Sequence, residues 1–211
     1  MGGISESRWA RIIYSKEGLS RFLGHLDTVR TVLRTLRRVD WPLVYSEGFT
    51  PRVKASFSPA LPIGFFSETE FIDLLLPSSA TEGKIRERSG FLKIALPCGL
   101  RLNRVELIPA FLRKKKIRAI EYWVSTGKME REGNVNIPCG EMEDQRGRRF
   151  NLKEWVAEAE RRGNILRLVI KMEEGVSPSP VKIVEFMMRK EQEEGRQTFL
   201  RKRFIFESIG T

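Results

Sequence analysis

Several side chains in the first fifty residues have the chemistry needed to bind or cleave a phosphate polymer. His25 is the single histidine of the chain, and Arg30, Arg34 and Arg37 follow it at intervals close to one helical turn. An imidazole can exchange a proton near neutral pH, and guanidinium groups spaced along a helix suit the phosphates of a nucleic acid. Two simpler interpretations stay open: the arginines can form a solvated helix face, and His25 can be a hydrogen-bonded structural residue.

Residues 45–59, YSEGFTPRVKASFSP, are a second candidate because they interleave aromatic and basic side chains. Stacking faces beside phosphate ligands are the combination used to bind single-stranded RNA. We expect Arg52 and Lys54 to contact phosphates, and Tyr45 and Phe49 to stack on bases or shape the groove. The alternative is a hairpin whose aromatic side chains point into the core.

A catalytic His25 would act as the acid or base in RNA cleavage, with the ribose 2′-hydroxyl as nucleophile. Arg21 or Lys54 would then stabilise the charged phosphorane, and Tyr14 or Lys16 would have to lie near the imidazole. Other catalytic signatures are missing from the sequence, which has no GxxxxGK[ST] phosphate loop, no GxGxxG after a strand and no HExxH.

Two further groups of residues have a simpler interpretation. The acidic side chains Glu68 and Glu70 are interpreted as solubilising strand residues rather than as a general acid and base. Four apolar residues nearby would form an exposed patch if the protein is a docking scaffold. These are Leu61, Ile63, Phe65 and Phe66.

Charge and cysteine content narrow the class of protein. The chain has 211 residues and a formal net charge of +11, which favours an anionic partner. Residues 1–110 hold 16 basic and 11 acidic side chains, and residues 111–211 hold 22 and 16, so charge does not separate the halves.

Two distant cysteines and one histidine cannot form a Cys/His metal cluster, so we expect no metal and no cofactor. A disulfide between Cys98 and Cys139 stays open.

Hydropathy points away from a membrane. No apolar run approaches the roughly 20 residues needed to span a bilayer, and the amino terminus lacks the apolar core of a signal peptide. We therefore expect a cytoplasmic protein. Its 31% charged residues, with few Asn and Gln, are typical of thermophile proteins.

The elements that position these residues follow from periodicity. In the first half we expect a strand at 8–16, a helix at 79–92, and strands at 67–76 and 100–108. Between the first two strands we expect a helix with Ser20 as its N-cap, ending before Trp41. The buried stripe of that helix is predicted to be Phe22, Leu26, Val29, Leu33 and Leu36.

The second half repeats this order, with strands at 120–125, 165–172 and 199–207 and helices at 151–162 and 180–189. Such an order is that of an α+β fold in which helices cover one face of an antiparallel sheet. The prediction is two tandem ferredoxin-like (RRM-like) domains, 1–109 and 110–211.

Three segments carry a resemblance to a known family: 21–38 (RFLGHLDTVRTVLRTLRR), 42–64 (PLVYSEGFTPRVKASFSPALPIG) and 67–76 (SETEFIDLLL). They resemble the radical S-adenosylmethionine-associated domain, a family of uncharacterised function found fused behind or encoded beside radical S-adenosylmethionine proteins, and sometimes ribonuclease G-type enzymes. The family has Ser in place of Gly24. It has His-Pro where this chain has Arg52-Val53. The loss of this second histidine weakens any proposal that needs a two-histidine site.

The resemblance implies a separately encoded radical S-adenosylmethionine protein as partner. Since no CxxxCxxC run exists here, this chain would be the detached accessory module. The resemblance also implies structural roles for His25 with Asp27, which would order the loop after the first strand, and for Ser46 and Gly48. A more distant architectural likeness is to CRISPR repeat-processing endoribonucleases.

The leading hypothesis is a non-catalytic module that binds RNA or a ribonucleoprotein and partners a radical S-adenosylmethionine enzyme. The alternatives are a metal-independent endoribonuclease using His25, and a protein-docking scaffold that does not bind RNA. In the leading hypothesis the nucleic-acid ligands are Arg21, Arg30, Arg34, Arg37, Tyr45, Phe49, Arg52 and Lys54.

Overall fold

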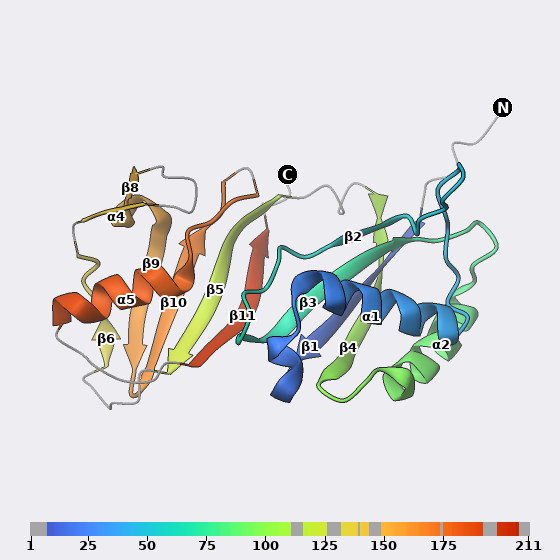
Figure 1. Cartoon of the computed structure of the whole chain (residues 1–211), viewed down its shortest axis with the longest axis horizontal. Coiled ribbons are helices and arrows are strands. Elements are labelled where there is room, and N and C mark those ends of the chain that lie inside the picture. The colour runs from blue at the N-terminus through green and yellow to red at the C-terminus, as the bar shows by residue number, and fades with distance from the viewer. Residues whose placement is uncertain are drawn as a thin grey trace. The chain divides into compact units, whose positions relative to one another are not determined.

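The chain divides into two compact units, Met1–Lys115 and Lys116–Thr211, coloured blue to green and yellow to red in Figure 1. The division lies at residue 115, whereas the sequence places it at 109. The computed structural model describes residues 8–110, 116–125, 132–138, 140–143, 149–173, 175–191 and 198–206. Each unit is a mixed α+β body built on antiparallel strands.

Unit 1 alternates strands and helices. Its sheet has the order β4-β1-β3, and β2 pairs with β3. Helices α1 and α2 lie against one face of this sheet (Figure 1). The elements in chain order are β1 (Arg8–Lys16), the 3-10 helix η1 (Gly18–Phe22), α1 (His25–Arg38), β2 (Ala55–Phe57), β3 (Phe66–Leu75), α2 (Glu82–Ala95) and β4 (Leu100–Pro109).

The core of unit 1 lies between the sheet and its helices. Strand β1 is buried along almost its whole length because β3 and β4 pair with it on both sides. Ile72 and Leu74 of β3 belong to one buried cluster with Leu36 of α1 and Leu92 of α2. Each such side chain contributes roughly 1.5–3 kcal/mol when it is removed from water, so the sheet fixes the positions of both helices.

The predicted start of α1 is wrong, and its predicted buried face is right only in part, since Leu36 is buried and Leu33 packs against the core. Helix α1 begins at His25 with Gly24 as its N-cap, while Ser20 belongs to η1. Phe22 and Leu26 are 53% and 66% exposed. The residues that α1 buries are Thr28, Val32, Thr35 and Leu36.

Threonine explains the shift of this face. The hydroxyl of Thr28 donates to the carbonyl of Gly24 at 3.0 Å, and that of Thr35 donates to the carbonyl of Thr31 at 2.9 Å. Because both hydroxyls are satisfied within the helix, threonine can be buried at little cost. The buried stripe therefore runs along the threonines.

Unit 2 has the strand order β11-β5-β10-β9-β6, and β7 pairs with β8 separately. Helix α5 lies against one face of the larger sheet (Figure 1). The elements are β5 (Ile117–Ser125), β6 (Gly133–Asn134), β7 (Glu141–Glu143), β8 (Arg149–Asn151), α4 (Leu152–Trp155), β9 (Val156–Arg162), β10 (Ile165–Lys171), α5 (Pro180–Glu191) and β11 (Thr198–Phe206). Among the described residues of both units, no helix is long and apolar enough to cross a membrane.

The helix predicted at 151–162 is wrong beyond its first turn. Asn151 does cap a helix, because its side chain accepts from the backbone N–H of Lys153, but α4 ends at Trp155. The following residues form β9, which pairs with β10 through a turn containing Gly163 at φ +60°. Pairing with a buried neighbouring strand overrides the helical spacing of the apolar residues.

Candidate nucleic-acid interface

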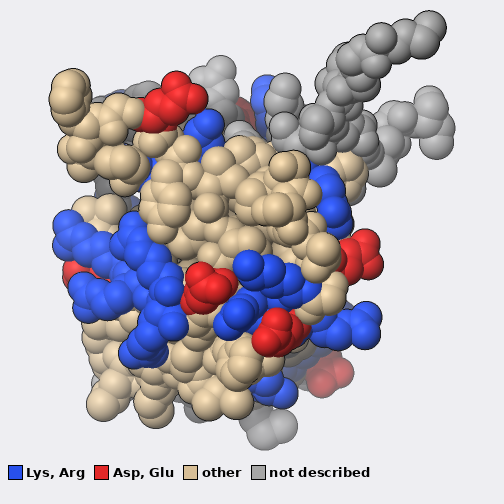
Figure 2. All heavy atoms as spheres, turned by 90° about the vertical axis from the view of Figure 1, so that its right-hand side faces the viewer, with Lys and Arg blue, Asp and Glu red and all other residues tan. Residues whose placement is uncertain are grey.

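The outer face of α1 carries an exposed row of arginines. Arg30, Arg34 and Arg37 are all exposed. The predicted local ion pair is present, since Nη1 of Arg30 lies 3.3 Å from Oδ1 of Asp27. Within the described residues, Arg34 and Arg37 form no ion pair. Figure 2 views this end of unit 1, and Lys and Arg side chains outnumber acidic ones on the face it shows.

A hairpin loop follows α1 and is closed by backbone hydrogen bonds. The N–H of Lys54 donates to the carbonyl of Val44, and that of Ser46 to the carbonyl of Arg52, both at 2.8 Å. The Oγ of Ser46 also accepts from the N–H of Arg52 at 2.9 Å. Ser46 therefore holds the two sides of the loop together.

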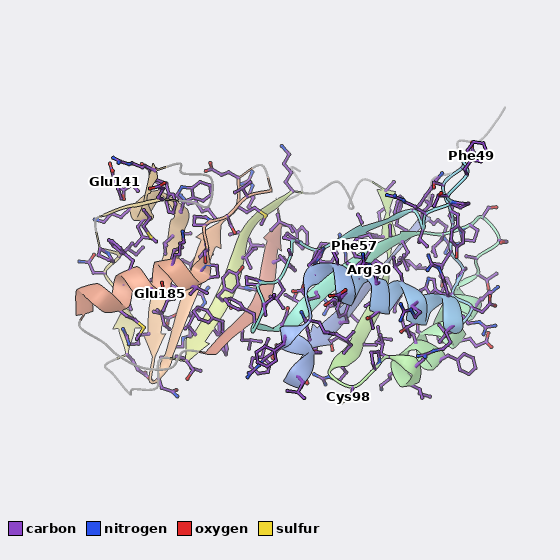
Figure 3. The ribbon with its side chains drawn as sticks, viewed as in Figure 1. Arg30, Phe49, Phe57, Cys98, Glu141 and Glu185 are labelled. Atoms are coloured by element: carbon purple, nitrogen blue, oxygen red, sulfur yellow. The ribbon has the colours of Figure 1, made fainter. Side chains whose placement is uncertain are left out.

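The tip of this hairpin presents an aromatic ring to solvent. Gly48 has a φ of +114°, a conformation that favours glycine. The adjacent Phe49 is fully exposed and lies at the far end of the loop (Figure 3). Arg52, Lys54 and Tyr45 are exposed as well. The alternative in which these aromatic side chains point into the core is therefore wrong for Tyr45 and Phe49.

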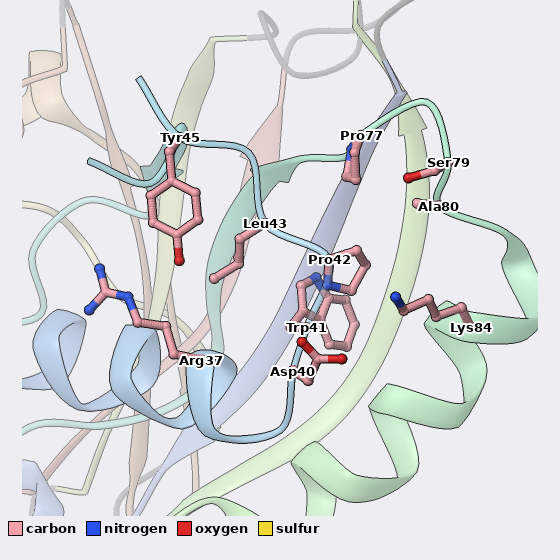
Figure 4. Close-up of a pocket in the computed structure, with 10 residues that line it drawn as sticks. All are labelled: Arg37, Asp40, Trp41, Pro42, Leu43, Tyr45, Pro77, Ser79, Ala80 and Lys84. Atoms are coloured by element: carbon pink, nitrogen blue, oxygen red, sulfur yellow. The ribbon is translucent and has the colours of Figure 1, made fainter. Parts of the chain in front are cut away.

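A surface pocket of about 430 Å³ lies between the end of α1, the hairpin and the start of α2 (Figure 4). It brings together two predicted residues, Arg37 and Tyr45, with two that the sequence analysis did not select, Trp41 and Lys84. Trp41 is 3% exposed, and its Nε1 has no hydrogen-bond partner among the described residues. The full lining is Arg37, Asp40, Trp41, Pro42, Leu43, Tyr45, Pro77, Ser79, Ala80 and Lys84.

His25 is the first residue of α1 and is half-buried. Its ring meets Phe57 edge to face, with centroids 6.4 Å apart. Tyr14 and Lys16 are both buried, and Nζ of Lys16 donates to the carbonyl of Leu23 at 2.6 Å. His25 makes no hydrogen bond to any residue that the structure describes, and Phe57 is an aromatic neighbour of its ring.

Arg21 lies apart from the pocket lining. Its guanidinium carbon is 4.7 Å from the centroids of both Phe22 and Phe66. These cation–π contacts hold the guanidinium in place, and its Nε is buried without a hydrogen-bond partner among the described residues. The structure therefore does not bring Arg21 together with Arg37 and Tyr45.

The interpretation of Glu70 as a solubilising residue is wrong. Glu70 is buried, whereas Glu68 is exposed. Its Oε2 accepts from the hydroxyl of Ser58 at 2.8 Å and its Oε1 from that of Ser67 at 2.7 Å. Because both oxygens are hydrogen-bonded, the carboxylate can remain inside the unit.

The predicted apolar patch is also wrong in two of its four members. Leu61 and Phe65 are buried, Phe66 is half-buried, and Ile63 is exposed. Exposed apolar side chains lie instead in and after η1, at Leu19, Phe22, Leu23 and Leu26. For the cysteines, Cys98 is exposed, and Cys139 lies outside the described residues.

A model of a known protein family matches most of the chain. No curated protein matches the chain. The model of a family described as uncharacterized protein conserved in bacteria, DUF2344, matches residues 10–195. The matched range runs from β1 through α5, across both units. Because the match covers most of the sequence, the chain belongs to the DUF2344 family of uncharacterised bacterial proteins.

Proposed function

We propose that unit 1 is a non-catalytic RNA-binding module. The observation that carries the proposal is the exposed arginine row on α1, in which Arg34 and Arg37 have no acidic partner among the described residues. An unpaired exposed guanidinium can bind a phosphate without first giving up an ion pair. A row of them along a helix can contact successive phosphates, which gives affinity without sequence preference.

The hairpin loop supports a single-stranded rather than a duplex ligand. Phe49 at its tip and Tyr45 at its base offer rings to solvent, with Arg52 and Lys54 beside them. Unstacked bases can stack on such rings, whereas paired bases within a duplex cannot.

The strand orders support a ferredoxin-like fold for each unit. In unit 1 the order is β4-β1-β3-β2, with helices after the first and third strands. In unit 2 the strands β11-β5-β10-β9 have the equivalent order, with α5 after the third. We propose that both units are ferredoxin-like, and that unit 2 has lost the full first helix.

The partner part of the proposal rests on the resemblance to the radical S-adenosylmethionine-associated family. In this proposal the protein acts in the cytoplasm and presents RNA, or a ribonucleoprotein, to a separately encoded radical S-adenosylmethionine enzyme. Co-purification with that enzyme, stable at high salt, tests this part independently of RNA.

Salt-dependent binding of a single-stranded RNA tests the proposed function. Replacing Arg30 and Arg34 together by Ala should weaken binding about tenfold and reduce the slope of log affinity against log salt by about 1.4, since each single-strand contact contributes about 0.7. The matched control replaces Arg101 and Arg104, which are equally exposed on β4 and, like Arg30, each paired with an acidic residue. Equal affinity of wild type and the α1 variant would overturn the proposal.

The same assay separates the cleavage alternative. With EDTA present and after long incubation, the bound RNA should remain intact, because His25 forms no hydrogen bond with a second acid–base group among the described residues. Cleavage that disappears in His25→Ala would replace the proposed function by the endoribonuclease hypothesis.

A further inference from the structure

We propose that the pocket between α1, the hairpin and α2 receives one nucleotide of the bound RNA, with its base against Tyr45 and the phosphates on its two sides at Arg37 and at Lys84. This inference rests on the proposed function and specifies its ligand more closely. It adds Lys84 and Trp41, which lie outside the arginine row, to the binding surface.

The charges of the pocket favour an anion. Arg37 and Lys84 come from two helices and stand on opposite sides of the pocket (Figure 4), and neither forms an ion pair with a described residue. Asp40 is the acidic residue of the lining, and its Oδ2 lies 3.6 Å from Nη2 of Arg88. Since no ion pair joins Asp40 to Arg37 or Lys84 among the described residues, each of these cations remains available to a phosphate.

The walls of the pocket favour a flat ring attached to that anion. The Tyr45 ring is partly exposed, and its hydroxyl points toward the Arg37 side of the pocket (Figure 4). The volume of about 430 Å³ lies within the usual range of small-ligand pockets. A nucleotide combines a phosphate with a stacking base, whereas inorganic phosphate would leave the aromatic wall uncovered.

Trp41 adds a buried indole to the same lining. Its indole Nε1 is buried without a partner among the described residues, and such donors are rare in folded proteins. Because this N–H is closed off from solvent, Trp41 forms part of the pocket wall rather than a hydrogen-bonding group for a ligand. The strained backbone of the preceding Asp40, at φ +51°, fixes the turn that places Trp41 in the lining.

The arginine row leads into this pocket. Arg37 is the last member of the row on α1 and also lines the pocket. A strand that contacts Arg30 and Arg34 would therefore reach the pocket at the next helical turn. This continuity favours a nucleotide within an RNA chain over a free mononucleotide.

Lys84 provides the test, because it does not belong to the α1 row. Lys84→Gln should weaken binding of a single-stranded oligouridine five- to tenfold and reduce the salt slope by about 0.7. The matched control is Lys93→Gln, since Lys93 is an exposed lysine near the other end of α2. It should leave both quantities unchanged. Tyr45→Ala should weaken binding, and Tyr45→Phe should retain most of it because stacking needs the ring.

The outcomes distinguish this inference from the proposed function. If the Arg30 and Arg34 variant weakens binding but Lys84→Gln does not, the pocket is not used and the RNA-binding module stands. If wild type binds no RNA, both fail together. Uridine monophosphate binding that depends on Lys84, without oligouridine binding, would also overturn the inference, because the site would then take free nucleotides. Thermal unfolding of each variant confirms that the fold is retained.

Discussion

The arginine row of unit 1 and the sheet arginines of unit 2 differ in how they are partnered. With the division at residue 115, unit 1 holds 19 basic and 11 acidic side chains, and unit 2 holds 19 and 16. In unit 1 the arginine row of α1 faces solvent, with Arg34 and Arg37 unpaired among the described residues. In unit 2, Arg162, Arg167 and Arg203 of the sheet form ion pairs with glutamates.

Glu121 is the centre of the arrangement in unit 2. Its Oε2 accepts from Nη2 of Arg167 at 3.1 Å and from Nε of Arg203 at 3.0 Å, and its Oε1 accepts from the indole of Trp123 at 2.9 Å. Arg167 also bonds Glu158 at 2.6 Å. These contacts join β5, β9, β10 and β11, so the charged side chains stabilise the sheet.

The pKa of Glu121 shows the strength of this network. Burial alone would raise that pKa, and it is the largest single influence. The hydrogen bonds from Trp123 and Arg167 and the charges of Arg167 and Arg203 together outweigh it, so the pKa lies below its ordinary value of 4.5. An arginine held in this way must lose a buried partner to bind phosphate. Net charge is therefore a poor guide to binding unless the pairing of each arginine is known.

Removal of a buried carboxylate from unit 1 should have the largest effect. Asp73 is buried and holds Arg11 through two bonds of 2.7 and 2.9 Å. Asp73→Ala leaves the guanidinium without this carboxylate, so we expect a loss of about 3–5 kcal/mol in the free energy of unfolding. Arg203→Ala in unit 2 should cost at most about 1 kcal/mol, since Arg203 is largely exposed and Arg167 still pairs with Glu121. Urea unfolding measures the loss of unfolding free energy in each variant. Equal losses in Asp73→Ala and Arg203→Ala would contradict the distinction between a single ion pair and a shared network.

Acid should weaken unit 2 through Glu121. Because its folded pKa is below its unfolded value of about 4.5, the ionised carboxylate stabilises the fold fully above that pH. This contribution is lost as pH falls through the folded pKa. The indole N–H resonance of Trp123 should report the protonation directly. Glu121→Gln should remove this part of the acid dependence, and an unchanged acid unfolding curve in that variant would contradict the assignment.

The sequence located most strands because their apolar residues alternate or are bounded by turn residues. β1, β3, β10 and β11 lie within a residue or two of their predicted bounds. Part of the buried face of α1 was missed because buried threonines, satisfied inside the helix, are not apolar by type, whereas the predicted Leu36 is buried. The helix predicted at 151–162 failed because its spacing fits a helix, while pairing with β10 is a tertiary effect.

Only part of the candidate site could be predicted from the types and spacing of residues in the sequence. Arg37 and Tyr45 were selected by residue type, within segments close in sequence. Lys84 could not be selected in this way, because β2 and β3 separate it from α1 in the sequence. Only the fold brings the start of α2 back to the end of α1. The position of the boundary also decides how net charge is divided. Division after residue 110 gives both halves a similar net charge, whereas division after residue 115 assigns the basic residues at 113–115 to unit 1.

A smaller change should make the arginine row more available. Asp27→Asn removes the partner of Arg30, whose bond is exposed and therefore weak. If the proposed function holds, affinity for single-stranded RNA should rise about twofold at low salt, since one guanidinium is freed. The control Glu106→Gln frees Arg104 on β4 in the same way and should leave RNA affinity unchanged. A rise in both variants would indicate a general charge effect rather than a site on α1.

The smallest effect concerns helix capping, in which the units also differ. Asn151 caps α4 in unit 2 with its side chain, whereas Gly24 leaves α1 without a side-chain cap. Gly24 has extended backbone angles, and an added Cβ would lie 3.6 Å from Oδ2 of Asp27, an ordinary contact. Gly24→Ser should therefore raise the free energy of unfolding by a few tenths of a kcal/mol.

Gly24→Ala separates capping from chain stiffness. Both substitutions restrict the unfolded chain, but only serine supplies an oxygen to accept from the free N–H groups of the first turn. Urea unfolding should place the serine variant about 1 kcal/mol above the alanine variant. RNA affinity should match wild type in both, because Gly24 lies at the opposite end of α1 from the pocket. Equal stability of the two variants would mean that α1 gains nothing from a cap, and that packing of its threonine face alone fixes where it begins.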